Sequence, residues 1–250
     1  MKYILFLDFD GTLAPIAKSP SKAIFPEATK KIIQKLSFNP KFRVAVISGR
    51  GLANIKELLK LKNIIYAGNH GYEINIYGQH WQHPKLSNIR PQMVEIFKIL
   101  SNNIHIKGVI IEDKGATLSL HYRMVAKSDL PELRKIFRRS IKKQRKSVNI
   151  TSGKKVWEVR PKLKWNKGEA VKMIIQRLKL KEFIPIYIGD DKTDEDAFKV
   201  LSKNGVTVKV GKGSKSLARH RLEDVKAVTR FLNNLNTDCI DKLLEARKSR

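Results

Sequence analysis

The sequence predicts an α/β fold, a doubly wound parallel sheet with a smaller inserted α/β domain. Three observations support this prediction: short apolar runs without polar alternation, helical patterns between them, and one interval in which the pattern changes. Runs rich in isoleucine and valine that do not alternate with polar residues are typical of parallel strands buried on both faces. The sequence contains five such runs: YILFL from Tyr3, FRVAVI from Phe42, NIIYA from Asn63, IPIYI from Ile184 and VTVKV from Val206.

Helical patterns separate these runs. Apolar residues recur at spacings of three and four in residues 29–36, 52–61, 169–180 and 194–201, as they do on the buried face of an amphipathic helix. Strands that alternate with helices indicate a sheet covered by helices on both sides.

The interval between about Gly78 and Lys164 breaks this alternation. It contains two segments in which apolar and polar residues alternate, GVIIEDKGATLSLHYRMV and KKVWEVRP, and two helical patterns, at 92–100 and from Leu130. Alternation is typical of an antiparallel sheet with one covered face.

This change of pattern defines two domains. We expect a core domain formed by residues 1–79 and 164–250, and an inserted cap domain formed by residues 80–163, which is long enough to pack independently. The hinge region is expected to contain Pro84, Pro91 and Pro161.

Positive charge is the most unusual feature of the composition. The 250 residues contain 51 Lys and Arg against 23 Asp and Glu, a formal net charge of +28. Such an excess attracts polyanions and favours nonspecific binding to nucleic acids at low salt. In the densest basic cluster, LPELRKIFRRSIKKQRK, the apolar residues Leu133, Phe137 and Ile141 have helical spacing, so we expect its cations to form the solvated face of a helix. Because no recognised binding motif accompanies the charge, we expect at most nonspecific binding to nucleic acid.

The remaining composition favours a soluble protein of the cytoplasm. Asp8 interrupts the first apolar run, and no later stretch is long enough for a membrane span. Cys239 is the only cysteine, so no intrachain disulfide is possible. We expect a cytoplasmic monomer that acts on a small molecule, with the C-terminal EARKSR as a solvated tail.

Polar residues directly follow four of the predicted strands. Each group alone has an ordinary structural interpretation, as an acidic surface pattern, a helix start with Ser48 as N-cap, or a turn. In an open α/β sheet, however, ligands bind beyond the carboxyl ends of the strands. The groups therefore predict one crevice lined by carboxylates, a hydroxyl and an arginine. They are Asp8-Phe-Asp10-Gly11-Thr12, Ser48-Gly49-Arg50, Gly68-Asn69-His70-Gly71 and Gly189-Asp190-Asp191.

This set of residues suits phosphoryl transfer. Asp8 and Asp10 are two residues apart in an extended segment, so their side chains point the same way. Clustered carboxylates repel one another unless a cation joins them, and oxygen ligands suit Mg²⁺. The metal would neutralise the phosphate and allow a carboxylate to attack it as a nucleophile.

The same motifs resemble those of the haloacid dehalogenase superfamily, and more narrowly those of the trehalose-6-phosphate phosphatases. The superfamily resemblance rests on DFDGT, ISGR, NKGEA and GDDKTDED in that order. The narrower one rests on LDFDGTLAPI, GNHGYE, EDKGATLSLHYR, WEVRP and GDDKTDEDAF. It implies a magnesium-dependent phosphatase that converts trehalose 6-phosphate to trehalose and phosphate.

The resemblance also implies a role for each residue of the crevice. Asp8 would attack phosphorus, and Asp10 would protonate the departing sugar oxygen and later deprotonate water. Ser48 and Lys167 would hold the phosphoryl oxygens. The magnesium ligands would be Asp8, the backbone carbonyl of Asp10 and the side chain of Asp190, with Asp191 and Asp194 as further carboxylates at or near the ion.

The inserted domain would supply sugar recognition. Ser119, His121 and Arg123 have one strand parity, Glu158 and Arg160 also share a face, and together they give a polar sheet surface of mixed charge. Such a polar face would close over the crevice, although a solvent-facing sheet with incidental ion pairs would show the same pattern. Lys114 could instead sit in a turn, and His70 could be a buried structural histidine. The expected substrate-binding residues are Arg50, Asn69, His70, Glu73, Glu112, Lys114, Ser119, His121, Arg123, Glu158 and Arg160.

Two other functions stay open at this point. One is a phosphatase for another sugar phosphate, such as mannosyl-3-phosphoglycerate or a glucosyl-glycerol phosphate. The other is a nucleic-acid-binding protein on a degenerate phosphatase fold, against which the intact Asp8, Asp10, Ser48, Lys167 and Asp190 argue. The charge of +28 has no explanation in the phosphatase hypothesis. We expect the phosphatase unit alone, because no synthase-like domain accompanies it.

Overall fold

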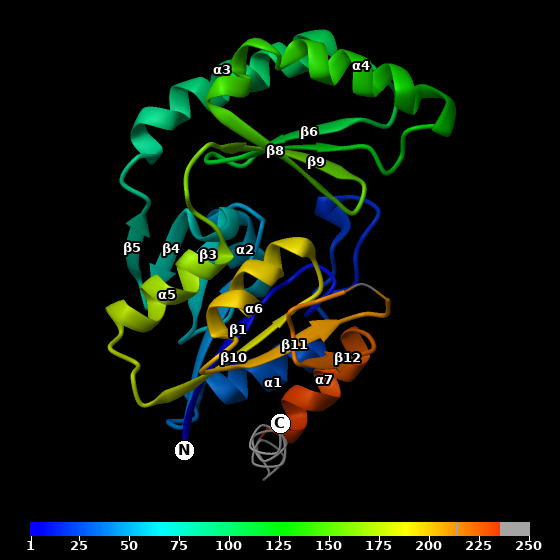
Figure 1. Cartoon of the computed structure of the whole chain (residues 1–250). Coiled ribbons are helices and arrows are strands. Elements are labelled where there is room, and N and C mark those ends of the chain that lie inside the picture. The colour runs from blue at the N-terminus through cyan, green and yellow to red at the C-terminus, as the bar shows by residue number, and fades with distance from the viewer. Residues whose placement is uncertain (214, 236–250) are drawn as a thin grey trace. The chain divides into compact units, whose positions relative to one another are not determined.

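The computed structural model describes residues 1–213 and 215–235, which fold into two compact units (Figure 1). The core unit contains Met1–Ala17, Ala23–Trp81 and the described chain from Trp165; the inserted unit contains Lys18–Lys22 and Gln82–Lys164. Cys239 and the EARKSR segment lie outside the described residues. In the described part of the chain, no helix combines the length and the apolar character that crossing a bilayer requires.

The core unit is built on an eight-stranded sheet with the order β12-β11-β10-β1-β2-β3-β4-β5. Neighbouring strands are parallel from β12 to β3, and β4 is antiparallel to β3. The strands are β1 (Lys2–Leu7), β2 (Phe42–Ile47), β3 (Ile65–Gly68), β4 (Glu73–Ile76), β5 (Gln79–Gln82), β10 (Phe183–Gly189), β11 (Val206–Val210) and β12 (His220–Leu222).

Helices cover both faces of this sheet. One apolar cluster joins Leu5 and Leu7 of β1 to α1 (Glu27–Phe38), α2 (Leu52–Leu59) and α7 (Val225–Asn234). A second cluster joins Ile4 and Phe6 of β1 to α5 (Lys167–Arg177) and α6 (Glu195–Leu201). Successive β1 residues therefore enter opposite clusters, which explains why the apolar runs do not alternate with polar residues. The predicted doubly wound α/β fold is confirmed.

The inserted unit contains a four-stranded antiparallel sheet with the order β6-β7-β9-β8. Its strands are β6 (Ile110–Asp113), β7 (Leu118–His121), β8 (Val148–Gly153) and β9 (Val156–Pro161), and its helices are α3 (Leu86–Asn103) and α4 (Leu130–Ser140). Both helices pack on one face of the sheet, through a cluster that includes Leu100, Phe137, Leu118 and Trp157.

The basic helix α4 has the predicted arrangement. Leu133 is fully buried and Phe137 is 3% exposed, and Ile141 directly after the helix is also buried, whereas the arginine and lysine side chains of α4 are exposed. The three prolines predicted for the hinge region lie in different surroundings. Pro91 lies inside α3 and Pro161 is the last residue of β9, so only Pro84 lies between elements.

The described residues also form short 3₁₀ turns, and two of these turns lie in the loops after β3 and β10. They are η1 (Pro20–Lys22), η2 (Asn69–Gly71), η3 (Lys127–Asp129), η4 (Lys143–Lys146) and η5 (Lys192–Asp194).

Candidate active site

The carboxyl ends of neighbouring strands bring the predicted catalytic residues to one edge of the core sheet. Asp8 directly follows β1 and Asp190 directly follows β10, and these two strands are paired in parallel. The Asp8 N–H donates to the carbonyl of Ile188 at 3.0 Å, and the Ser48 N–H donates to the carbonyl of Ala67 at 2.9 Å. The loops after β10, β1, β2 and β3 therefore lie side by side.

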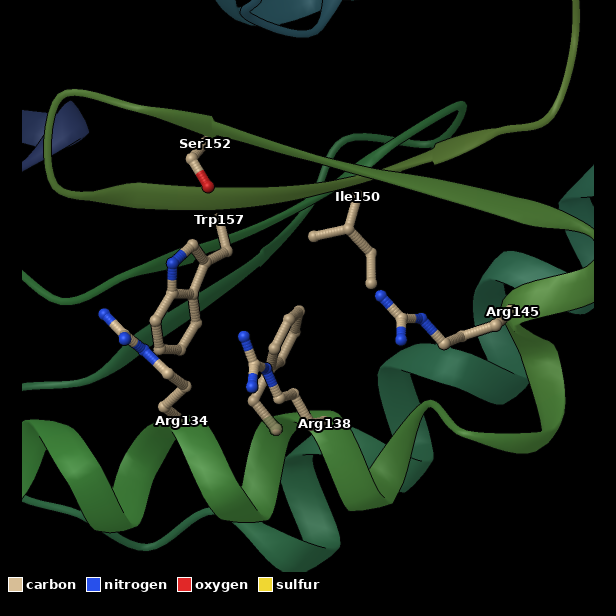
Figure 2. Close-up of a pocket in the computed structure, with 7 residues that line it drawn as sticks. Arg134, Arg138, Arg145, Ile150, Ser152 and Trp157 are labelled. Carbon is tan, nitrogen blue, oxygen red and sulfur yellow. The ribbon is translucent and has the colours of Figure 1, made fainter.

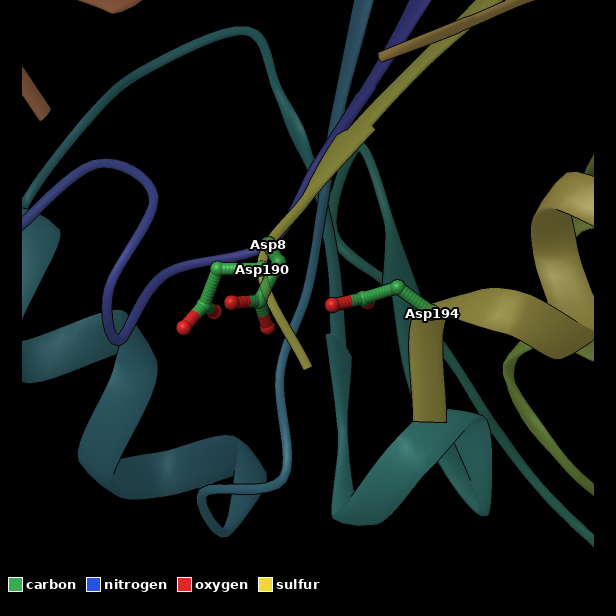
Figure 3. Close-up of side chains that lie close together, drawn as sticks. All are labelled: Asp8, Asp190 and Asp194. Carbon is green, nitrogen blue, oxygen red and sulfur yellow. The ribbon is translucent and has the colours of Figure 1, made fainter. Parts of the chain in front are cut away.

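Three buried carboxylates gather at this edge (Figure 3). Asp8, Asp190 and Asp194 each offer an oxygen atom, and these atoms all lie within 4.8 Å of one another. Gly11 allows the approach of Asp190, because its φ is +89° and a Cβ at this position would lie 2.2 Å from Oδ2 of Asp190. Burial raises the pKa of Asp8 well above its ordinary value; Lys167 opposes this shift, and the carboxylates of Asp194 and Asp190 add to it.

Lys167 is buried between two of these carboxylates. It is the first residue of α5, whose N-cap Asn166 accepts a hydrogen bond from the Glu169 N–H at 3.0 Å. Lys167 Nζ donates to Oδ1 of Asp8 and to Oδ1 of Asp194, each at 2.7 Å. Burial disfavours the charged form of Lys167, but Asp194 and Asp8 outweigh burial and raise its pKa well above the ordinary value. The ammonium therefore stays charged at the position predicted for phosphate binding.

Asp194 holds Lys167 and the loop after β10 in place. Its Oδ1 accepts from Lys167 and from the hydroxyl of Tyr187 at 2.7 Å, and its Oδ2 accepts from the Asp191 N–H at 2.9 Å. Burial acts to raise the pKa of Asp194, but Lys167 and these hydrogen bonds lower it below the ordinary value. Both carboxylate oxygens of Asp194 therefore already accept hydrogen bonds.

Asp191, the other acidic residue next to Asp190 in the loop after β10, caps the short turn η5. Its side chain and that of Asp194 form a reciprocal capping box at the start of η5. Tyr187 is not among the predicted site residues, because it lies inside an apolar strand. The available signal was its hydroxyl, since a fully buried tyrosine needs a hydrogen-bond partner.

Asp10 lies outside the carboxylate cluster and pairs with Arg50. The Arg50 Nε and Nη2 atoms donate to the two oxygens of Asp10, each at 2.7 Å. Arg50 is itself buried, donates to Asn54 at 3.1 Å, and lies over the ring of Phe9. This two-pronged geometry fixes the orientation of the Asp10 carboxylate.

The loops after β2 and β3 hold one another. Ser48 is buried, and its Oγ accepts from the Arg50 N–H at 3.1 Å. The His70 N–H donates to the Ser48 carbonyl at 2.9 Å, and Asn69 Nδ2 donates to Glu73 Oε2 at 2.6 Å. The alternative of Ser48 as a helix N-cap is wrong, because α2 begins at Leu52 with Gly51 as N-cap.

Asn69 and His70 adopt left-handed backbone conformations, with φ of 50° and 58°. A Cβ on Gly49 would lie 2.8 Å from Cε1 of His70, so the imidazole lies directly against the Ser48-Gly49-Arg50 loop. The structure thus places Asn69 and His70 in the core unit as buried residues that support the site.

The inserted unit carries most of the other predicted substrate residues on the sheet face opposite its helices. Ser119 and Glu158 are paired across β7 and β9, whereas their neighbours Leu120 and Trp157 enter the apolar cluster beneath the helices. This division confirms the predicted parity of these residues.

Contacts between polar side chains connect the residues of this face. Lys114 Nζ donates to Glu158 Oε1 at 2.6 Å, and Arg160 Nε lies 4.0 Å from Glu158 Oε2. His121 Nε2 lies 2.9 Å from Glu112 Oε2. The face therefore holds connected donors and acceptors whose positions are mutually fixed.

Two residues of this set differ from expectation. Arg123 lies beyond the end of β7 and donates to the carbonyl of Lys154 at 2.6 Å, so the prediction that it shares a strand face with Ser119 is wrong. Lys114 does lie in the turn between β6 and β7, beside Gly115 with φ of +85°, yet its side chain still reaches Glu158.

Known proteins are similar to this chain in sequence and in fold. "Trehalose-phosphate phosphatase B" of Arabidopsis thaliana is 32% identical over 93% of this chain, and "Probable trehalose-phosphate phosphatase 2" of Oryza sativa subsp. japonica is 36% identical over 81% of it. The chain spans 66% and 59% of the length of these two relatives.

Among solved structures, a "trehalose-6-phosphate phosphatase related protein" superposes with a TM-score of 0.82 at 25% identity, covering 96% of this chain and 99% of that chain. A haloacid dehalogenase-like hydrolase from Bacteroides thetaiotaomicron shares the fold, with a TM-score of 0.66 at 14% identity over 94% of this chain and 100% of that chain.

The family model of trehalose-phosphatase matches residues 6–226, a span that runs from the strand before Asp8 through Ser48, Lys167 and Asp190 into α7. Because this match covers most of the chain and includes the residues of the Asp8 cluster, the chain belongs to the trehalose-phosphatase family.

Proposed function

We propose that the chain is a magnesium-dependent phosphatase that hydrolyses trehalose 6-phosphate to trehalose and phosphate. The observation that carries this proposal is the buried cluster of Asp8, Asp190 and Asp194 around Lys167, at the carboxyl edge of a parallel sheet. The names of the relatives support trehalose 6-phosphate as the substrate.

The charge of the cluster fits a divalent cation. Three ionised carboxylates and one ammonium sum to two negative charges in a buried space, and repulsion between carboxylates is relieved by a cation. Asp8, Asp190 and the backbone carbonyl of Asp10 would hold Mg²⁺ through oxygen atoms. When bound, the ion would offset the charge of the phosphate and polarise its oxygens.

The reaction has two steps, each of which the residues present can perform. In the first, a carboxylate oxygen of Asp8 attacks phosphorus, the bond from phosphorus to the sugar oxygen breaks, and Asp10 gives that oxygen a proton. In the second, Asp10 takes a proton from water, and the water oxygen attacks the aspartyl-phosphate, restoring Asp8 and releasing phosphate.

Cationic and hydroxyl groups stabilise the phosphoryl group in both steps. Lys167 Nζ already lies 2.7 Å from Asp8 and so stands next to the attacked phosphorus. With Ser48 it supplies donors to the oxygens that gain charge in the transition state. Arg50 fixes the carboxylate of Asp10 through two hydrogen bonds, which orients the proton donor and acceptor.

Residues 80–163 serve as a cap that recognises the sugar. The polar sheet face with Lys114, Glu158, Arg160, Glu112 and His121 offers both donors and acceptors, as the hydroxyl groups of a disaccharide require. Asn69, His70 and Glu73 support the loops of the core unit, and Ser119 adds a hydroxyl to the cap face.

Phosphate release from a panel of sugar phosphates, with and without Mg²⁺, tests this function. We expect the fastest release from trehalose 6-phosphate with Mg²⁺, and loss of activity in Asp8→Asn. Glu57→Gln is a matched control, because Glu57 lies on α2 with a side chain that is 74% exposed. Full activity of Asp8→Asn would exclude the covalent mechanism.

Two other outcomes would replace the proposal. Faster release from mannosyl-3-phosphoglycerate would move the substrate assignment to another sugar phosphate. Salt-dependent binding to DNA without phosphate release from any sugar phosphate would favour a nucleic-acid-binding protein.

A further inference from the structure

The inserted unit contains a cavity on the helix-covered side of its sheet. The cavity has a volume of about 220 Å³ and lies among α4, η4 and strands β8 and β9 (Figure 2). Trp157 and Ile150 line it from the strands. The face that carries Glu158 is the opposite face of the same sheet, so this cavity is separate from the sugar-recognition face. The lining residues are Arg134, Phe137, Arg138, Arg145, Ile150, Ser152 and Trp157.

Three guanidinium groups gather around this cavity. Arg134 and Arg138 are one turn apart on α4, and Arg145 reaches in from η4 (Figure 2). All three are exposed, and no ion pair joins any of them to a carboxylate among residues 1–213 and 215–235. Three like charges at one cavity repel one another unless an anion lies between them.

The segment around the cavity contains little negative charge that could balance these arginines. Residues 130–146 contain eight lysine and arginine residues and only one acid, Glu132. The amphipathic pattern of α4 explains the burial of Leu133 and Phe137, but it does not require that arginines surround a cavity. A guanidinium offers a planar fork of N–H donors that matches phosphate oxygens.

We propose that this arginine cavity binds the phosphate group of a small phosphorylated metabolite, at a site distinct from Asp8. The apolar side chains of Phe137, Ile150 and Trp157 line the same cavity, so they offer contact to the carbon skeleton that bears the phosphate. The volume is below the roughly 300 Å³ at which pockets for drug-sized ligands begin. The cavity therefore suits one or two phosphate groups with part of their carbon skeleton.

A small ligand fits this arrangement better than nucleic acid. Contacts to a nucleic-acid backbone need cations spread along a strip, and bases need exposed aromatic rings for stacking. Here the three arginines converge on one cavity, and Trp157 is 8% exposed and packed against Phe137. The proposal does not depend on the phosphatase function, because it uses none of the residues around Asp8.

Isothermal titration calorimetry of the whole chain with tripolyphosphate, at fixed ionic strength and without divalent metal, tests the proposal. The absence of metal leaves the Asp8 cluster with net negative charge, which disfavours anion binding there. The test variant is Arg138→Gln with Arg145→Gln, which removes two cations of the cavity. The matched control is Arg139→Gln with Lys142→Gln, which removes the same charge from exposed residues that do not line the cavity.

We expect tripolyphosphate affinity to fall at least about tenfold in the cavity variant, because one hydrogen bond to a charged group contributes about one factor of ten. The control should lose less than about threefold, as expected from a change in net charge screened by salt. Circular dichroism of both variants establishes that each is folded.

Equal losses in the two variants would overturn the proposal, because they would show that affinity follows net charge alone. An unchanged affinity in the cavity variant would also overturn it. A single-stranded oligonucleotide that binds the chain more tightly than tripolyphosphate, and equally weakens in both variants, would show that the basic surface binds nucleic acid instead.

Discussion

Replacement of Asp8, the proposed nucleophile, is expected to stabilise the metal-free protein while abolishing its activity. Asp8→Asn removes one of three clustered carboxylates, which lie within 4.8 Å of one another. At an effective dielectric constant of about 20, each such pair of charges repels by about 3.5 kcal/mol, so Asp8 experiences about 7 kcal/mol of repulsion.

The attraction of Asp8 to Lys167 does not outweigh this repulsion. At the 2.7 Å separation of Asp8 Oδ1 and Lys167 Nζ, the same estimate gives about 6 kcal/mol of attraction. About 1 kcal/mol of repulsion is left, and burial of the charge adds to it. The amide introduced by Asp8→Asn would keep a neutral oxygen for Lys167, so we expect the free energy of unfolding without metal to rise by about 1 kcal/mol.

Urea denaturation with and without Mg²⁺ measures this effect. At a magnesium concentration of one hundred times Kd, the native protein should gain about 2.7 kcal/mol of stability, and Asp8→Asn should gain much less. Asp10→Asn is the matched control, because it removes a carboxylate that pairs with Arg50 outside the cluster. Its metal-free stability should not rise.

The pH dependence of this difference has a definite sign. The pKa of Asp8 is raised in the folded protein above an unfolded value of about 3.9. A raised pKa stabilises the folded state fully below the unfolded pKa, and this contribution is lost as the pH rises through the folded pKa. The metal-free native protein should therefore lose stability relative to Asp8→Asn as the pH rises. A metal-free Asp8→Asn variant less stable than the native protein at neutral pH would refute the reasoning.

Three further substitutions test other contacts. Tyr187→Phe removes the hydroxyl that donates to Asp194 at 2.7 Å. We expect thermal or urea unfolding to show that the free energy of unfolding falls by about 1.5 to 3 kcal/mol, the usual contribution of a hydrogen bond to a charged group. An unchanged unfolding curve would contradict this role of Tyr187. Gly11→Ala places a Cβ 2.2 Å from Oδ2 of Asp190, so steady-state kinetics should show a higher magnesium requirement, and wild-type magnesium dependence would argue against Asp190 as a ligand. Glu158→Gln breaks the ion pair with Lys114. KM for trehalose 6-phosphate should rise about tenfold, as expected for the loss of one charge-assisted hydrogen bond, while hydrolysis of p-nitrophenyl phosphate should stay the same. Equal losses of activity on both substrates would contradict a role of Glu158 in sugar recognition.

Local pattern predicted most of the core unit. The strands that begin near Tyr3, Phe42 and Val206 are present because uninterrupted apolar runs need burial on both faces. Helix boundaries were predicted less well: α5 begins at Lys167 and α3 begins at Leu86, earlier than expected, because side-chain caps and tertiary packing decide where a helix starts.

The inserted unit shows the limit of parity arguments. The alternation correctly predicted that Ser119 and Glu158 lie on the sheet face opposite to that of Leu120 and Trp157. It failed for Arg123, because parity holds only within a strand and β7 ends at His121. Which alternating segment continues as a strand depends on its pairing partner, and that partner is distant in the sequence.

The sequence by itself determined that Asp8 and Asp190 would lie close together, because the carboxyl ends of parallel strands share one edge of a sheet. Only the tertiary structure decided how the charges are paired. Lys167 joins Asp8 and Asp194 across separations of 159 and 27 residues, and Arg50 takes the carboxylate of Asp10. Pairings of this kind depend on distances between side chains of separate elements, which no local periodicity specifies. For the same reason, the basic segment from Leu130 predicted only a helix with a charged face. The arginine cavity also requires residues of η4 and β8, which lie beside α4 only in the folded structure.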